Sequence, residues 1–360
     1  MAKLWQRTRG ADGTSQLHDV SLTDLRITRP SVIYLSGFLT TDGQPGFIAG
    51  GLKRLEEMMG HRPAPHDAQD VDLYAWSHTS LGNLFNMAAY NMQPQTRASA
   101  AAQSLALGVI MPLVARDFKI DGDGNLSGTP LPEAEAKRNL RNITLFGYSA
   151  GTITAQECYN ASLQMMQKLG YKTETARDVL HEVALVSAGN VSRPSKEKDR
   201  FTTVYLVASN DKIILAKNRI WTPLKTMFAR FARNLNIKKL SATSAFISAA
   251  VSKQKWEWRE AKGKTWKERI RPLIPSWTFV KSYHELPHYI THDENLSQFA
   301  KIVNFSLTNA IARAPVYAGG DGKRLDPLDM IQPPEGFPAP AAAAYNTKID
   351  KAMVAKGVRI

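Results

Sequence analysis

Ser149 lies at the centre of a segment with the pattern Gly-x-Ser-x-Gly, formed by Gly147, Tyr148, Ser149, Ala150 and Gly151. A short apolar run precedes the segment and a sequence with helical spacing follows it. A serine in a tight strand-to-helix turn stands out from the backbone, and flanking glycines leave room for the neighbouring chain. The segment therefore predicts a nucleophilic serine. A structural turn with a capping serine is the alternative.

A serine nucleophile needs a general base, and the base needs an acid that orients it. On a strand–helix scaffold the chain order is serine, then carboxylate, then histidine. Asp211 fits the acid because it follows the strand-like run 203–208. The preceding run, 183–187, ends in Ser-Ala-Gly-Asn and offers no carboxylate. A turn formed by an Asn-Asp pair is the alternative role for Asp211.

Three histidines downstream of the acid are candidates for the base: His284, His288 and His292. His284 lies at or directly after a strand-like run, 278–283, and His292 adjoins the last predicted helix. His288 lies between them, in a loop that can turn back toward Ser149. The spacing favours His288 and leaves His284 and His292 open as alternative bases.

The oxyanion of a tetrahedral intermediate needs hydrogen-bond donors. The backbone N–H of Ala150, directly after the nucleophile, is one candidate. The other is the N–H of Phe38, because Gly37-Phe38 forms the turn after an early strand-like run. The sequence predicts neither a metal nor another cofactor, since the pair His61 and His66 lacks a convergent ligand set.

These candidate residues must be held in place by alternating strands and helices. Strand-like runs cover 31–36, 71–76, 143–146, 183–187, 203–208 and 278–283, and helical spacing covers 47–59, 98–118, 152–169 and 293–307. Apolar strands that alternate with helices predict an α/β fold, in which helices cover both faces of a mostly parallel central sheet. In such a sheet the reactive side chains gather beyond the carboxyl ends of the strands.

Four short segments together resemble the α/β-hydrolase superfamily, in particular bacterial carboxylesterases and monoacylglycerol-lipase-like serine hydrolases. YLSGFLTTD is similar to the L-H-G-F-T-G loop of that group, with Ser36 where histidine usually stands, and GYSAG fits the nucleophile elbow. ASNDKII resembles the segment that bears the acid, and PHYITHD resembles the segment around the catalytic histidine. The resemblance implies an α/β-hydrolase fold and a catalytic triad of Ser149, Asp211 and His288.

The net charge of +14 belongs to one part of the chain. From Lys212 to Lys281 there are 17 Lys and Arg residues against three acidic ones, and the remainder holds 29 of each sign. Residues 215–275 also interrupt the alternation, without a convincing strand. We therefore expect a basic helical insertion between the last two strands.

Aromatic and basic side chains of this insertion recur at helical spacing on different helix faces. Such a helix suits a lid over an acyl-binding cleft or contact with an anionic membrane surface, with contacts from Trp221, Phe228, Phe231, Arg230 and Arg233. Packing on the domain with a solvated basic face is the alternative. Nucleic acid is the least favoured partner because no binding motif accompanies the charge.

The sequence thus divides into an N-terminal extension (1–30), a hydrolase-like core (31–214 and 276–310), the insertion (215–275) and a Pro/Ala-rich tail (311–360). Cys158 is the only cysteine, which favours a reducing compartment and a packed rather than reactive thiol. No signal peptide or transmembrane helix is evident, so we expect a cytoplasmic or peripheral membrane location, with signal-independent export left open. Nothing in the sequence indicates the oligomeric state.

The expected function is therefore hydrolysis of a carboxylic ester, from a small molecule or a lipid, through an acyl-enzyme. The alternative is a binding protein on a hydrolase scaffold, which docks an anionic membrane or another anionic partner through the basic segment.

Overall fold

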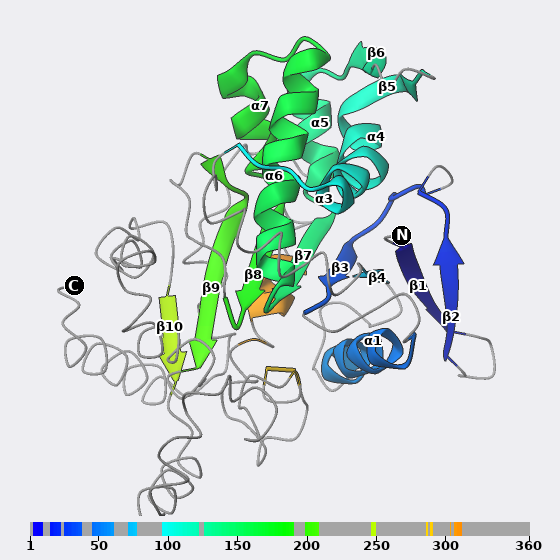
Figure 1. Cartoon of the computed structure of the whole chain (residues 1–360), viewed down its shortest axis with the longest axis vertical. Helices are drawn as coiled ribbons and strands as arrows, with labels where there is room; N and C mark the ends of the chain where they lie inside the picture. Colours follow the sequence, from blue (N-terminus) through cyan, green and yellow to red (C-terminus); the bar gives the residue numbers. More distant parts are fainter. Residues whose placement is uncertain are drawn as a thin grey trace, which may run out of the picture.

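The computed structural model describes residues 3–9, 15–22, 25–37, 45–60, 71–77, 96–121, 126–190, 199–208, 246–249, 286, 289–290, 303 and 306–311. A mixed central sheet organises them (Figure 1). Its strands are β1 (Lys3–Arg9), β2 (Ser15–Val20), β3 (Ser31–Leu35), β4 (Asp72–Ser77), β7 (Ile143–Tyr148), β8 (Ala184–Ala188), β9 (Thr202–Ala208) and β10 (Phe246–Ala249).

The strand order across this sheet is β10-β9-β8-β7-β3-β4-β1-β2. The strands from β10 to β4 pair in parallel, whereas β1 is antiparallel to both β2 and β4. The sheet is therefore mostly parallel, as the sequence predicts. The predicted strands 31–36, 71–76, 143–146, 183–187 and 203–208 are confirmed within one or two residues at their ends.

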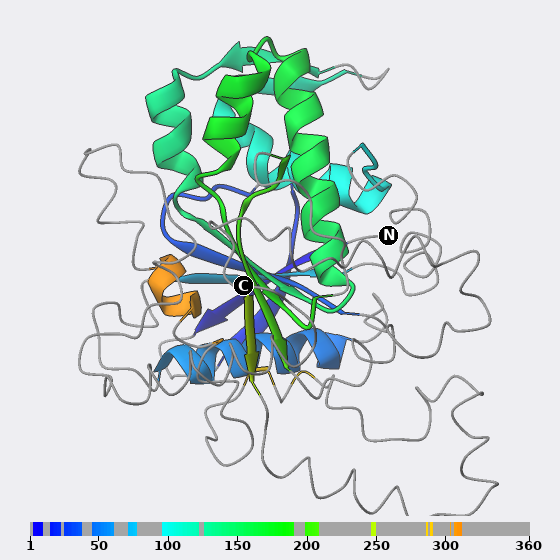
Figure 2. The ribbon, with the colours of Figure 1, turned by 90° about the vertical axis from the view of Figure 1, so that its left-hand side faces the viewer.

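Helices cover both faces of the sheet (Figure 2). One face carries α3 (Ala100–Leu105), a π-helical turn η2 (Ala106–Ile110), α4 (Met111–Val114), α5 (Glu133–Leu140), α6 (Gly151–Lys168) and α7 (Thr173–Leu180). The other carries α1 (Pro45–Gly60) and a helical segment that includes residues 306–311. This two-sided cover explains why strands such as β3 read as continuous apolar runs.

The alternation of side chains along β3 and β7 divides the core into two apolar layers. Val32 and Tyr34 of β3 pack with α1, whereas Ile33 and Leu35 pack on the opposite layer. Successive strand residues point to opposite faces, so a strand that is buried on both sides contributes to both layers. The order of strands and helices thus follows from burial of apolar area on each face.

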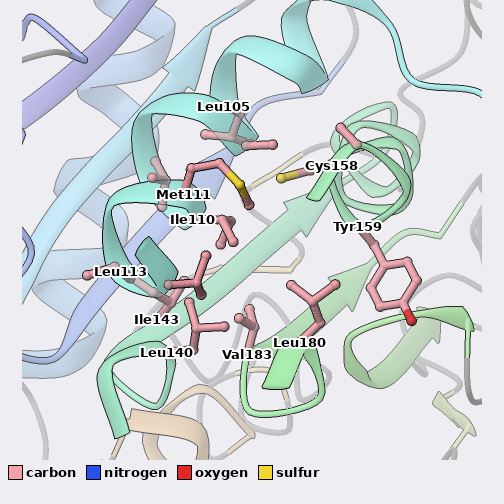
Figure 3. Close-up of a cluster of buried hydrophobic side chains, with 14 of the residues drawn as sticks. Leu105, Ile110, Met111, Leu113, Leu140, Ile143, Cys158, Tyr159, Leu180 and Val183 are labelled. Atoms are coloured by element: carbon pink, nitrogen blue, oxygen red, sulfur yellow. The ribbon is translucent and has the colours of Figure 1, made fainter. Parts of the chain in front are cut away.

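The larger layer joins α3, η2 and α4 to α6 and α7 (Figure 3). Leu105, Ile110 and Met111 project from the first group toward Cys158 on α6, and Ile143 closes the cluster from the sheet. Cys158 is buried here, as expected for a packed thiol. The layer holds α6 firmly against the strand that precedes it.

The N-terminal segment is part of the sheet, although the sequence analysis sets residues 1–30 apart as an extension. β1 pairs with β4 from Lys3–Ser77 to Arg7–Leu73, and β2 pairs with β1. Leu4 is 1% exposed and belongs to the larger apolar layer. β1 reads Lys-Leu-Trp-Gln-Arg-Thr-Arg, and its two adjacent apolar residues are a weaker strand signal than a mostly apolar run.

The predicted helix 98–118 is wrong at its C-terminal end, because helix α4 ends at Val114. The chain then forms an antiparallel hairpin of β5 (Ala115–Ile120) and β6 (Leu126–Pro130). The terminal carbonyls find partners outside the helix: the Asn139 side-chain amide donates to Leu113 O, and the N–H of Leu131 donates to Val114 O. These tertiary partners end the helix, although the local sequence favours its continuation.

The basic insertion also departs from expectation, because it contains a strand. Residues 246–249 form β10, which pairs in parallel with β9 at the edge of the sheet. The rest of the insertion, the predicted strand 278–283 and residues 312–360 of the tail lie outside the described residues. Of the predicted helix 293–307, Val303 and residues 306–311 are described as helical, so this helix extends four residues further. Within the described ranges no helix is both long and apolar enough to cross a membrane.

The contribution of β1 to the core can be tested by Leu4→Ala. We expect the free energy of unfolding to fall by about 2–5 kcal/mol, because the truncation leaves a cavity beside buried neighbours. Gln16→Ala, on the exposed side of β2, is the control and is expected to change it by less than about 0.5 kcal/mol. Chemical denaturation measures both. Equal stabilities for the two variants would show that β1 is not integral to the core.

Candidate active site

The region beyond the carboxyl ends of β3 and β7 is the place where this topology favours a site. β3 leads toward α1 on one face of the sheet, and β7 leads into α6 on the other. Ligands of open α/β sheets bind where neighbouring connections diverge in this way. Gly37 lies just after β3 and Ser149 just after β7, so two of the segments singled out from the sequence meet there.

The backbone of Ser149 is unusual. Its φ angle is 53°, in the left-handed region that residues other than glycine rarely adopt. The N–H of Ser149 donates to Ala188 O of β8 over 3.1 Å, and the Thr152 hydroxyl donates to Ser149 O over 2.6 Å. Strained residues of this kind cluster at functional sites and persist only where the surrounding structure fixes them.

The two glycines of the segment lie where the chain is crowded. A Cβ added to Gly151 would lie 2.0 Å from Leu35 O at the end of β3. A Cβ added to Gly147 would lie 3.3 Å from Thr152 Cα. The first contact is with backbone and has no flexible group that could yield, so residue 151 must be glycine for α6 to start this close to β3.

The N–H of Ala150 is the donor that the turn leaves open. The first bonds of α6 run from Thr152 N to Ser149 O and from Ile153 N to Ala150 O. Among the described residues, the buried N–H of Ala150 donates no hydrogen bond. Because it lies at the N-terminus of an 18-residue helix, it is suited to a negatively charged oxygen.

The loop after β3 lies directly against this turn. A Cβ on Gly37 would lie 3.2 Å from Ser149 Cβ and 2.9 Å from Tyr148 Cδ1. Ser36, which stands where the resembling family has histidine, is buried, and its hydroxyl donates to Trp76 O over 3.1 Å. The Ser36 hydroxyl therefore ties the end of β3 to the end of β4. Phe38, the predicted second donor, lies outside the described residues.

The histidine-bearing segment is anchored beside the same turn. Tyr289 and Ile290, which directly follow His288, are fully buried in the smaller apolar layer. The ring of Tyr289 packs on that of Tyr148, with centroids 5.7 Å apart and planes at 58°. His284, His288 and His292 themselves, and Asp211, lie outside the described residues.

The basic residues of the insertion are not described either. Trp221, Phe228, Phe231, Arg230 and Arg233 fall outside the described ranges, as do His61 and His66. Within those ranges no three His, Cys, Asp or Glu side chains gather closely enough to hold a metal ion.

Two other side chains of α6, the thiol of Cys158 and the carboxylate of Glu157, are ionisable but make their contacts elsewhere in the fold. Burial raises the pKa of the Cys158 thiol to about 12, so it stays protonated at neutral pH and is a poor nucleophile. Burial also raises the pKa of Glu157, whose carboxylate accepts hydrogen bonds from Arg97 Nε at 3.2 Å and from the Ser99 hydroxyl. Glu157 therefore fastens the start of α3 to α6.

Tyr34 is a residue of this region that sequence reasoning missed. It is buried on β3, where burial raises the pKa of its phenol and a backbone hydrogen bond with Gly37 acts against that rise. A tyrosine within a mostly apolar strand carries a hydroxyl that needs a buried partner, which is the signal that could have marked it. The partner itself is visible only in three dimensions.

Comparison of the chain with protein-family models and with curated proteins found no match. The fold and the site geometry therefore carry the functional argument.

The steric role of Gly151 is tested by Gly151→Ala. The added methyl group would overlap the Leu35 carbonyl, so we expect a loss of about 3 kcal/mol in the free energy of unfolding. Gly50→Ala on α1 is the matched control, because its added methyl group meets nothing within 4 Å and alanine favours helix by about 1 kcal/mol. Thermal or urea unfolding measures both. Equal stability of Gly151→Ala and wild type would contradict the close approach of α6 to β3.

Proposed function

We propose that the protein is a serine hydrolase of the α/β-hydrolase type that cleaves a carboxylic ester. The observation that carries the proposal is the turn at Ser149: a serine with positive φ between a parallel strand and a helix, followed by an N–H without a partner among the described residues. A turn that served only to reverse the chain would need neither the strain nor a crowded glycine contact.

The resemblance supplies the partners of the nucleophile, and the surrounding structure supports them. Asp211 comes three residues after β9, whose carboxyl end lies at the same edge of the sheet as that of β7. His288 precedes Tyr289, which packs on Tyr148, and consecutive Cα atoms are only about 3.8 Å apart. Asp211 thus follows a strand that ends at the same sheet edge as β7, and His288 directly precedes a residue that contacts Tyr148.

In the proposed reaction, Ser149 Oγ attacks the ester carbonyl carbon while His288 takes the hydroxyl proton. The oxyanion receives hydrogen bonds from the N–H groups of Ala150 and Phe38. His288 then gives the proton to the departing alkoxide. The alkoxide leaves as an alcohol, and the acyl group stays on Ser149. In the second half of the reaction His288 takes a proton from water while the water oxygen attacks the acyl carbon. His288 returns that proton to Ser149 Oγ as the carboxylic acid leaves. Asp211 orients the imidazole and stabilises its charged form.

The nucleophile is tested by labelling with a fluorophosphonate, which phosphorylates or phosphonylates activated serines. We expect wild type to be labelled at Ser149 and Ser149→Ala to be unlabelled, with activity on p-nitrophenyl acetate reduced at least about 10³-fold. Ser187→Ala, a buried serine at the end of β8, is the control and keeps the label. Intact-mass spectrometry reads the adduct. A folded wild-type protein that takes no label would overturn the proposal.

The identity of the base is tested by replacing His284, His288 and His292 singly with alanine. Removing the base leaves the serine hydroxyl without a proton acceptor, so we expect kcat for p-nitrophenyl acetate to fall about 10³-fold or more in His288→Ala. The other two variants should lose less than about tenfold. Steady-state kinetics provide the measurement, and a larger loss at His284 or His292 would transfer the role to that residue.

A further inference from the structure

Two donors of Thr152 converge on the backbone carbonyl of Ser149. The Thr152 hydroxyl donates to Ser149 O over 2.6 Å, and the Thr152 N–H donates to the same oxygen over 3.0 Å. A carbonyl oxygen has two lone pairs, so it can accept both bonds. Thr152 is 1% exposed, which holds its side chain within the fold. The direction of the Ser149 carbonyl is thus held by two bonds from one residue.

The Ser149 carbonyl and the Ala150 N–H belong to one peptide group. This group is trans and planar, so its C=O and its N–H point in opposite directions in the same plane. The bonds that hold the Ser149 oxygen therefore also set the direction of the Ala150 N–H. That N–H is buried and donates no hydrogen bond among the described residues.

The hydroxyl of Thr152 takes a place that a regular helix would fill with backbone. In an α-helix a carbonyl accepts from the N–H four residues further on, which for Ser149 is that of Ile153. The N–H of Ile153 instead donates to Ala150 O over 3.0 Å. Valine at residue 152 would fill the same space as threonine but would remove the shorter of the two bonds to Ser149 O.

Gly147 leaves room for Thr152 to make these bonds. A Cβ added to Gly147 would lie 3.3 Å from Thr152 Cα and 3.4 Å from Gly151 O. A side chain there would press on the first turn of α6, from which both bonds to Ser149 O come.

We propose that Thr152 is a positioning residue that aims the Ala150 N–H at the oxyanion. The proposal rests on the function proposed above, and Thr152 acts through the shared peptide group, not on the ester itself. A hydrogen bond to the carbonyl of a peptide group also polarises the group, which strengthens its N–H as a donor. Direction matters as well, because a displacement of about 1 Å at a reacting centre can cost about 100-fold in rate.

The test compares Thr152→Val with wild type on p-nitrophenyl acetate. We expect kcat to fall by about tenfold or more while KM changes less than about twofold. The reason is that an oxyanion donor stabilises the transition states of both acylation and deacylation and not the bound ester. Steady-state kinetics measure both constants.

Thr202→Val is the matched control. The Thr202 hydroxyl is also buried and also donates to a backbone carbonyl, that of His181, over 2.6 Å. Thr202 begins β9, at the amino edge of the parallel strands and away from Ser149. Its replacement should lower thermal stability and leave kcat unchanged. An equal loss of kcat in the two valine variants would overturn the role of Thr152.

A second pair of variants isolates the hydroxyl. Thr152→Ser and Thr152→Ala both lack the methyl group of threonine and differ from each other only in the hydroxyl. We expect the serine variant to keep kcat within about threefold of wild type and the alanine variant to lose about tenfold or more. This pair decides the matter if Thr152→Val fails to fold. Equal kcat values for the serine and alanine variants would contradict the proposal.

Fluorophosphonate labelling separates this result from failure of the proposed function. If wild type is labelled at Ser149 and Thr152→Val is labelled at the same rate, the serine hydrolase stands and the positioning role is wrong. If wild type takes no label, both are overturned. Slower labelling of Thr152→Val, with Thr202→Val at the wild-type rate, supports both.

Discussion

The contact between Gly151 and the Leu35 carbonyl is the constraint on which the candidate site depends. It lets α6 begin against the end of β3, although the helix itself follows β7. The same close approach brings Ser149 next to Gly37, because Leu35 and Gly37 lie at the end of β3 and Ser149 and Gly151 follow the end of β7. A side chain at residue 151 would separate α6 from β3 and draw the serine away from the loop that faces it. The distance between Ser149 and Gly37 therefore depends on this close backbone approach.

That packing also explains how the strained turn is maintained. A non-glycine residue with positive φ costs about 1–3 kcal/mol, which neighbouring interactions must offset. The pairing of β7 with β8 runs up to Tyr148 and Ala188, and the next bond, from Ser149 N to Ala188 O, continues it into the turn. The Thr152 hydroxyl then fixes the carbonyl of Ser149. The sheet and the first turn of α6 therefore determine the Ser149 backbone from both sides.

The elements around the site could be predicted from the sequence because each carries a strong local signal. The runs at 31–36 and 143–146 are mostly apolar, and the glycines on either side of Ser149 mark the strand-to-helix turn. The elements that were missed lack such signals. β1 is mostly polar, and among its residues with described burial only Leu4 is buried. The end of α4 depends on Asn139 and Leu131, which are distant in sequence and meet it only in the fold.

The same limit applies to Tyr34, whose ring is buried between Phe146 of β7 and Gly51 of α1, neighbours that only the fold brings to it. The sequence predicts the N–H groups of Ala150 and Phe38 as oxyanion donors. Of these two, the N–H of Ala150 donates no hydrogen bond to the described residues, and Phe38 lies outside them. Catalytic donors must be held in place before charge develops, because reorganisation during the reaction would cancel their benefit. The Tyr34 ring, buried between β7 and α1, ties the end of β3 into the core, so the strand end next to Ser149 is fixed by core packing.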